Sequence, residues 1–194
     1  AGQVRLVAVP ATAPWAPVRP LAVLLLERGT LTGVWRGLVV APEVDYAGPE
    51  DVLLEADLDE PFDPSAGMVQ TWHARYCPAA RLGRSIAWLT PERLTAVRTV
   101  AEEPASTPPD PTQARPGSVE VRAIAGGYRV LTGTPLGGDD DPRVRYRTLY
   151  EEAATAWIGE RAPISSPEAA PGLGELAAAL GRRAAGVVEG LAER

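Results

Sequence analysis

The sequence contains no lysine, and cysteine, histidine, methionine and phenylalanine each occur only once in its 194 residues. With Cys77 as the single cysteine, the chain cannot form an internal disulfide, and a reducing cytoplasm is the expected compartment. The apolar run at residues 21–26 has only the length of a strand. Because a membrane-spanning helix requires about 20 apolar residues, we expect no membrane association.

Positive charge is also scarce. All 19 basic residues are arginines, against 25 acidic residues, and the net charge is −6. Residues 1–101 have a net charge of −2 (9 arginines, 11 acidic residues), and residues 102–194 have one of −4 (10 and 14). A general nucleic-acid-binding protein presents a basic surface, so the composition supports RNA binding only through a local groove of arginines.

Several common kinds of chemical site are missing as well. The sequence has no glycine-rich phosphate loop, no zinc-ligand spacing and no nucleophile elbow, so we expect neither a cofactor nor a metal ion. The acidic residues between Glu50 and Asp63 lack the central glycine and the final glutamate of a calcium loop, which indicates a solvated rim. The aspartates at 139–141 are typical of a helix start, where the helix dipole favours negative charge.

The strongest local pattern lies at residues 85–101. A short apolar stretch leads to Thr90, which can cap a helix, and to Pro91, which fits the first helical turn. Leu89 and Leu94 stand at the two positions of a hydrophobic staple, which fixes how a chain enters a helix. The pattern therefore predicts a strand followed at once by a helix with one apolar stripe.

Short strands are predicted before this helix. The apolar or alternating stretches that indicate them lie at residues 4–9, 21–26, 33–40, 52–54 and 68–72. Several short strands followed by a helix predict an α+β fold, in which residues 1–101 form a small SH3-like β-barrel closed by the helix.

A second part follows a proline-rich boundary. Five prolines occur between residues 102 and 117, a density that excludes a helix or a central strand, so we predict a linker there. Residues 119–123 and 128–132 alternate on either side of Gly126-Gly127, which indicates a β-hairpin.

Two amphipathic helices are predicted after the hairpin. The first begins near Arg143 and runs for roughly 18 residues, with Tyr146, Tyr150 (or Leu149) and Trp157 on one face. The second has an apolar stripe between residues 176 and 191. Together with the hairpin, these helices form a predicted α+β extension over residues 118–194.

Four segments within the first 101 residues share their pattern with one protein family. Arg19 to Leu24 is Arg-Pro followed by an apolar strand, and Val39 to Pro42 ends a strand in Ala-Pro. Arg81 to Ile86 and Leu89 to Leu94 have the order and spacing of a closing strand and helix. In these segments the sequence resembles the MazF/PemK family of toxin endoribonucleases, which are SH3-like barrels. The resemblance covers about half of the chain and says nothing of residues 102–194.

The resemblance implies metal-independent RNA cleavage and an antitoxin as a protein partner. In the family an arginine after the first strand and a threonine after Ala-Pro perform the cleavage. The arginine corresponds to Arg19, which could stabilise the phosphorane, but the expected place of the threonine holds Glu43 or Val44, and neither donates a hydroxyl. Another group would have to accept the proton of the 2′-OH, and Asp45, Glu43 and His73 are the candidates.

Two classes of function follow. The first is an RNA-directed, toxin-like endoribonuclease in which Arg19, Asp45 and His73 are the catalytic residues. The second is a non-catalytic SH3-like interaction module, which binds a protein or single-stranded nucleic acid and has lost the family's activity. His73 also has a structural interpretation, as a strand residue satisfied by a local hydrogen bond. A homodimer is left open in both cases.

Overall fold

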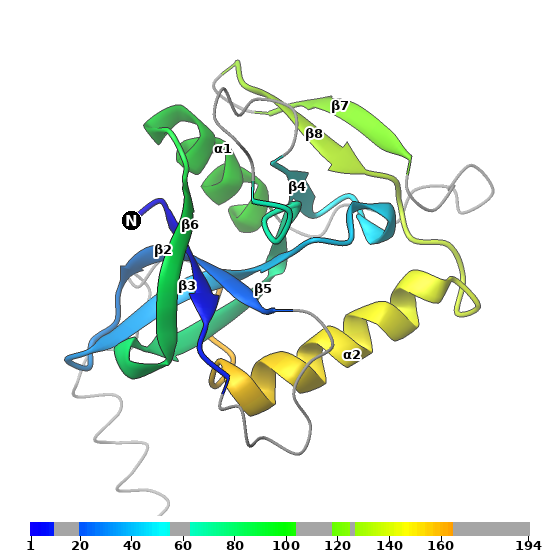
Figure 1. The fold of residues 1–194 in the computed structure, drawn as a ribbon. Helices are drawn as coiled ribbons and strands as arrows, with labels where there is room; N and C mark the ends of the chain where they lie inside the picture. Colours follow the sequence, from blue (N-terminus) through cyan, green and yellow to red (C-terminus); the bar gives the residue numbers. More distant parts are fainter. Residues whose placement is uncertain (10–19, 55–62, 104–117, 125–126, 165–194) are drawn as a thin grey trace, which may run out of the picture. The chain divides into compact units, whose positions relative to one another are not determined.

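The structure, a computed structural model, describes residues 1–9, 20–54, 63–103, 118–124 and 127–164 (Figure 1). These residues belong to one compact unit, Ala1–Ile164, and the fold is α+β as predicted. Most of the predicted linker and the whole of the predicted last helix lie outside the described residues, so the predicted domain boundaries, at residues 101 and 118, stay a prediction. Within the described residues no helix is long and apolar enough to cross a membrane.

The described part contains eight strands, two α-helices and two short 3₁₀ helices. The strands are β1 (Gln3–Val7), β2 (Ala22–Arg28), β3 (Val34–Ala41), β4 (Asp51–Leu53), β5 (Met68–Pro78), β6 (Leu82–Trp88), β7 (Val119–Ala123) and β8 (Arg129–Gly133). The helices are α1 (Pro91–Glu102), α2 (Pro142–Trp157), η1 (Val44–Tyr46) and η3 (Ala79–Arg81).

The strands form one antiparallel sheet in the order β6-β1-β2-β3-β5-β4-β8-β7. The predicted closed barrel is therefore wrong: the sheet is open, and β6 and β7 stand at its two ends. The three-residue strand β4 pairs with β5 along one edge and with β8 along the other. Because both edges of β4 are used in this way, the sheet continues into the predicted hairpin instead of returning to β6.

The sequence of β2 is continuously apolar up to Leu26 because both faces of this strand are buried. Alternate side chains of a strand point to opposite faces of the sheet. Leu24 and Leu26 pack in the core that contains α1, whereas Val23 and Leu25 pack in the core that contains α2. Both faces of this strand are thus covered, and an uninterrupted apolar run is the pattern expected of such a strand.

Helix α1 begins as its sequence predicts. The Thr90 side chain caps it by accepting a hydrogen bond from the Arg93 backbone N–H at 3.2 Å, and Pro91 occupies the first turn. Leu89 is buried and Leu94 packs against the same core, as the hydrophobic staple requires. The helix thereby lays its apolar stripe on one face of the sheet.

Helix α2 lies against the other face, and its start is also built as predicted. Asp141 caps it by accepting a hydrogen bond from the Arg143 backbone N–H at 2.9 Å. The Asp141 carboxylate also binds the buried Arg143 guanidinium at 2.6 Å, and this bond holds the pKa of Asp141 well below its usual range. Tyr150 and Trp157 of the predicted face pack against the same core as the buried Ala154 and Ile158, so this face meets the sheet. The alternative residue Leu149 is exposed.

Candidate functional site

Two of the predicted catalytic residues, Arg19 and Asp45, belong to the segments that precede β2 and follow β3 in the sequence. Ala22 at the start of β2 pairs with Val40 near the end of β3. The segment that leads into β2 and the segment that follows β3 therefore lie at the same end of the sheet. Arg19, in the first of these segments, is outside the described residues.

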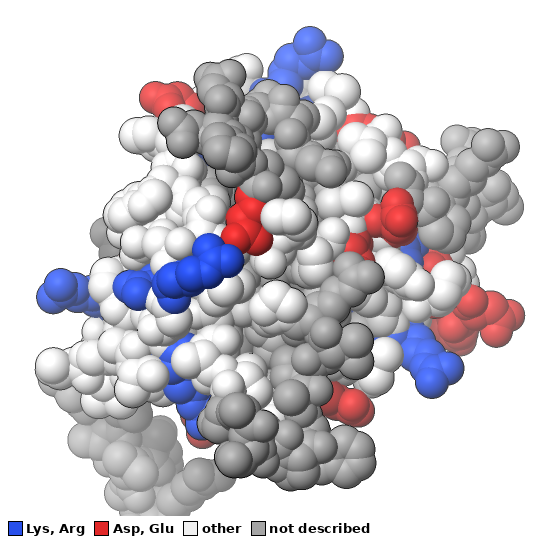
Figure 2. Space-filling model, in the orientation of Figure 1, with Lys and Arg blue, Asp and Glu red and all other residues white. Residues whose placement is uncertain are grey.

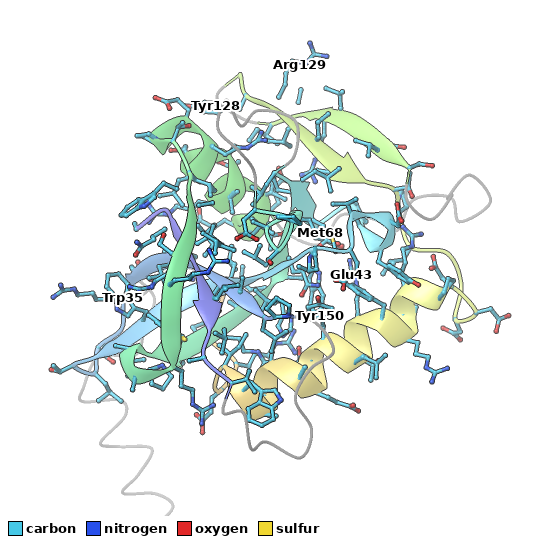
Figure 3. All side chains as sticks on the ribbon, in the orientation of Figure 1. Trp35, Glu43, Met68, Tyr128, Arg129 and Tyr150 are labelled. Atoms are coloured by element: carbon cyan, nitrogen blue, oxygen red, sulfur yellow. The ribbon has the colours of Figure 1, made fainter. Side chains whose placement is uncertain are left out.

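Glu43, in the second segment, is held by helix α2. Its Oε2 atom accepts a hydrogen bond from the Tyr150 hydroxyl at 2.6 Å and another from the Tyr146 hydroxyl at 3.1 Å. Figure 3 shows Glu43 and Tyr150 on the side of the sheet that faces α2. Glu43 is half-buried, and its carboxylate is held by two side chains of α2 that lie more than 100 residues further along the chain.

A close backbone approach keeps this segment against β5. A Cβ atom added at Gly67 would lie 2.8 Å from the Pro42 carbonyl oxygen and 2.9 Å from a methyl carbon of Val44. Neither contact is tolerable for a real Cβ, and one of the two atoms belongs to the backbone. Glycine at position 67 is therefore required for the segment that contains Glu43 to pack as it does.

The two tyrosines are fixed donors. The Tyr146 ring stacks on the Tyr46 ring with centroids 4.5 Å apart, and its hydroxyl lies 3.5 Å from Gln70 Nε2. Burial, together with the nearby Tyr150 and Glu43, raises the pKa of Tyr146 far above its ordinary value. The phenol stays protonated, and it can act on Glu43 only as a hydrogen-bond donor.

His73 is completely buried beside this group. Its Nδ1 atom lies 2.8 Å from Gln70 Oε1, and its Nε2 atom lies 3.0 Å from Arg75 Nη2. Burial, and then the positive charge of Arg75, lowers the pKa of His73 to about 3. Since arginine can only donate, Nε2 must be the accepting nitrogen and Nδ1–H must donate to Gln70. His73 is a neutral imidazole with both nitrogens engaged.

Glu151 of α2 approaches both His73 and Arg75. Its Oε1 atom is 2.5 Å from Arg75 Nη2, and its Oε2 atom is 3.1 Å from His73 Nε2. The histidine contact would be an ion pair only if the imidazole were protonated, which the lowered pKa of His73 opposes. Glu151 is therefore the ionic partner of Arg75, and Arg75 also binds Thr155 Oγ1 at 3.0 Å and the Gly159 carbonyl at 3.2 Å.

The carboxylate of Asp51 is buried and lies near Arg147, in the first half of α2. Asp51 accepts hydrogen bonds from the Gly48 backbone N–H at 2.7 Å and from Trp72 Nε1 at 3.0 Å. The Arg147 guanidinium stacks over the Trp72 ring at 4.7 Å and binds Glu50 at 2.7 Å. Burial raises the pKa of Asp51 to about 6, although Arg147 opposes this shift.

These positions place two of the predicted catalytic residues in different environments. Asp45 is exposed on η1, whereas His73 is sealed beneath α2, and no interaction joins them among the described residues. The geometry of His73 fits its structural interpretation. Glu43, the third candidate proton acceptor, is the one that the structure surrounds with donors.

Sequence reasoning missed the polar role of α2. The sequence pattern predicts Tyr146 and Tyr150 as part of an apolar stripe. A buried tyrosine hydroxyl also needs a hydrogen-bond partner, and the periodicity of apolar residues does not show which residue that partner is. The signal was the two hydroxyls spaced four residues apart on the face that meets the sheet.

Within the described ranges, no group of three or more histidine, cysteine, aspartate or glutamate side chains is arranged to hold a metal ion.

Comparisons with known proteins show similarity to solved structures but not to a known family. No family model matches the sequence, and no curated protein is similar to it. Among solved structures, the chain is similar to an endoribonuclease from a mycobacterial species, determined in complex with its cognate antitoxin. The TM-score is 0.36 and the sequence identity 18%, and the similar region covers 51% of this chain and 84% of that protein.

Proposed function

We propose that this protein is a non-catalytic interaction module that binds a protein partner. The observation that supports this most directly is the position of Glu43. It stands at one of the two positions, 43 and 44, where the sequence resemblance places the family's threonine, and its carboxylate is occupied by Tyr146 and Tyr150 of the chain's own helix α2. A substrate phosphate would have to displace these contacts, and a carboxylate repels a phosphate.

The arrangement of charge supports a protein partner over RNA. RNA binding needs arginines that are available to phosphates. Among the described residues, ion pairs join Arg36 to Glu27, Arg75 to Glu151, Arg84 to Asp63, Arg122 to Glu103, Arg143 to Asp141 and Arg147 to Glu50. The described part of the face seen in Figure 2 carries both signs of charge: the largest blue group lies at the left and most red side chains lie at the right, so no basic field covers the whole face.

One observation favours a second function, metal-independent RNA cleavage. Pro20, which directly follows Arg19 in the sequence, and Glu43 adjoin the same end of neighbouring strands, because Ala22 pairs with Val40. In this alternative Glu43 accepts the proton of the 2′-OH and Arg19 stabilises the phosphorane. Asp45 would remain an exposed acid beside Glu43, and His73 would support the fold without touching RNA.

Incubation of the full chain with a long RNA of mixed sequence, without metal ions, distinguishes the two functions. The variants Arg19→Ala and Glu43→Gln are assayed beside the wild type, with Arg145→Ala as an exposed-arginine control. We expect intact RNA in all four samples at high protein excess. Discrete fragments that disappear with Arg19→Ala and Glu43→Gln, but persist with Arg145→Ala, would reject the non-catalytic proposal.

A further inference from the structure

The outer edge of strand β7 is a surface that the proposed function does not use. β7 is the last strand of the sheet order, and among the described residues no strand pairs with its outer edge (Figure 1). Val119 is 51% exposed and Val121 is 56% exposed. Large apolar side chains on a free strand edge favour pairing with another strand.

The hydrogen bonds of the hairpin decide which residues of β7 face outward. The Ile124 backbone N–H donates to the Tyr128 carbonyl at 2.9 Å, so Ile124 is bonded towards β8. Antiparallel pairing alternates along a strand, and residues 120 and 122 are therefore also bonded towards β8. The backbone N–H and C=O groups of Val119, Val121 and Ala123 then point to the open edge.

The sequence of β7 is complementary to itself when it is read in the opposite direction. A twofold axis at Val121 pairs Val121 with Val121 of a second copy, and Val119 with Ala123 of that copy. These are the residues whose backbone groups point outward, so each can form a hydrogen-bonded pair. The same axis places Glu120 directly opposite Arg122 of the second copy, and the reverse.

The charges select this register over its neighbours. An axis at Glu120 would place two glutamates directly opposite each other, and an axis at Arg122 would place two arginines there. Opposite charges across a strand pair are stabilising and like charges destabilising. The Glu120–Arg122 pair would also occupy a position without inter-strand hydrogen bonds, where the side chains of the two strands lie closest together.

We propose that β7 pairs antiparallel with β7 of a second copy of this chain, about a twofold axis at Val121. The Arg122 guanidinium binds Glu103 and the Pro49 carbonyl of its own chain, the latter at 3.2 Å, and its side chain remains 32% exposed. Its guanidinium has five N–H donors, so it can bind another carboxylate while it keeps these partners. The result is an isologous dimer with one continuous sheet. This interface is independent of whether the protein cleaves RNA.

The size of the contact predicts a weak, salt-sensitive dimer. Five residues per strand bury much less than the roughly 1,200 Å² that stable interfaces reach. Two exposed charge pairs contribute to the association, and dissolved salt screens them. The dimer should therefore form with rising protein concentration and dissociate as salt is added.

Sedimentation velocity of the full chain over a series of concentrations tests the pairing and its register. With Glu120→Arg, arginine lies opposite Arg122 of the second copy at both symmetry-related positions, and we expect about tenfold weaker dimerisation. Arg122→Glu should weaken it similarly by opposing two glutamates. An equimolar mixture of the two variants restores both opposite-charge pairs, so a heterodimer should form at the wild-type concentration.

Two further variants keep the test decisive if Arg122→Glu, which also faces Glu103, does not fold. Val121→Pro removes only an outward N–H and should abolish the dimer while leaving the hairpin intact by circular dichroism. Glu152→Arg, on the exposed side of α2, makes the same charge change as Glu120→Arg and should dimerise like the wild type. A wild-type chain that stays monomeric at its highest attainable concentration overturns the proposal. So does a dimer that Val121→Pro leaves unchanged.

Discussion

Helices α1 and α2 cover opposite faces of one sheet and differ in how much polar contact attaches them to it. Besides its apolar packing, α1 donates hydrogen bonds to the sheet from Arg93 to the Leu53 carbonyl and from Arg98 to the Leu26 carbonyl. The side chains that α1 buries are Ala96, Val97, Val100 and Ala101. Those that α2 buries are Arg143 and Ala154, and around them its tyrosine hydroxyls, Glu151 and Arg147 find polar partners on the sheet. Apolar packing is non-directional and independent of pH. A buried polar network depends on every partner and on protonation.

The consequence is that the two attachments should fail in different ways. Loss of one methyl group from α1 weakens packing by an amount set by the cavity left behind. Loss of one donor beneath α2 leaves other buried groups without partners, and each of these costs about 1–3 kcal/mol. The three changes below act on this difference, in order of decreasing effect.

Arg75→Ala should have the largest effect. The substitution removes the donor to His73, the ionic partner of Glu151 and the hydrogen bonds to Thr155 and Gly159. We expect the free energy of unfolding, measured by urea denaturation at pH 7, to fall by about 3 kcal/mol.

The control for this change is Arg145→Ala, on the exposed side of α2, which should alter stability by less than about 0.5 kcal/mol. If Arg75→Ala were no more destabilising than its control, the network would not attach α2 to the sheet.

Asp51 should make the folded state less stable as the pH rises. Its folded-state pKa is about 6, above its ordinary value of 3.8. Between these two pH values the folded state therefore keeps a proton on Asp51 that the unfolded state has released. The stability contributed by this proton is present below pH 3.8 and is lost as the pH rises through about 6. The loss amounts to about 2–3 kcal/mol.

The measurement is the difference between the wild type and Asp51→Asn in urea denaturation at several pH values. This difference removes the contribution of His73, whose lowered pKa acts in the opposite direction by destabilising the fold as the pH falls from 6.5 towards 3. Parallel curves for the two proteins would show that folding does not raise the pKa of Asp51. The same series with Leu24→Ala, in the core beneath α1, should shift the curve down without changing its slope.

The difference between the two helices also explains what the sequence could and could not predict. Thr90, Pro91 and the staple leucines act within one turn of α1, so local pattern was sufficient there. β5 was predicted to end near Trp72 and in fact continues to Pro78, because the polar stretch around His73 and Arg75 is satisfied by a helix about 80 residues further along the chain.

The error about the barrel has a similar cause. Alternation shows which side chains of β4 share a face, but it does not show which strand takes its second edge. That edge pairs with β8 through Val52 and Thr132, a contact between segments on either side of the proline-rich stretch. Glu43 was recognised as a departure from the family's threonine, and its partners, Tyr146 and Tyr150, lie more than 100 residues away.

Tyr150→Phe should have the smallest effect and should act locally. The substitution keeps the ring in its place and removes the hydrogen bond of 2.6 Å to Glu43. Because Tyr146 still donates to the same oxygen, we expect a loss of about 1 kcal/mol in the free energy of unfolding.

Hydrogen exchange of the backbone amides at residues 43–47 is the more specific readout, since the segment that contains Glu43 should open more often once α2 holds it by one hydrogen bond. Tyr46→Phe is the matched control. Among the described contacts, Tyr46 stacks on Tyr146 through its ring alone, so the loss of its hydroxyl should leave this exchange unchanged. Equal exchange in Tyr150→Phe and the wild type would mean that α2 covers the segment without holding it. The proposed non-catalytic function, which relies on α2 occupying the Glu43 carboxylate, would then lose its main support.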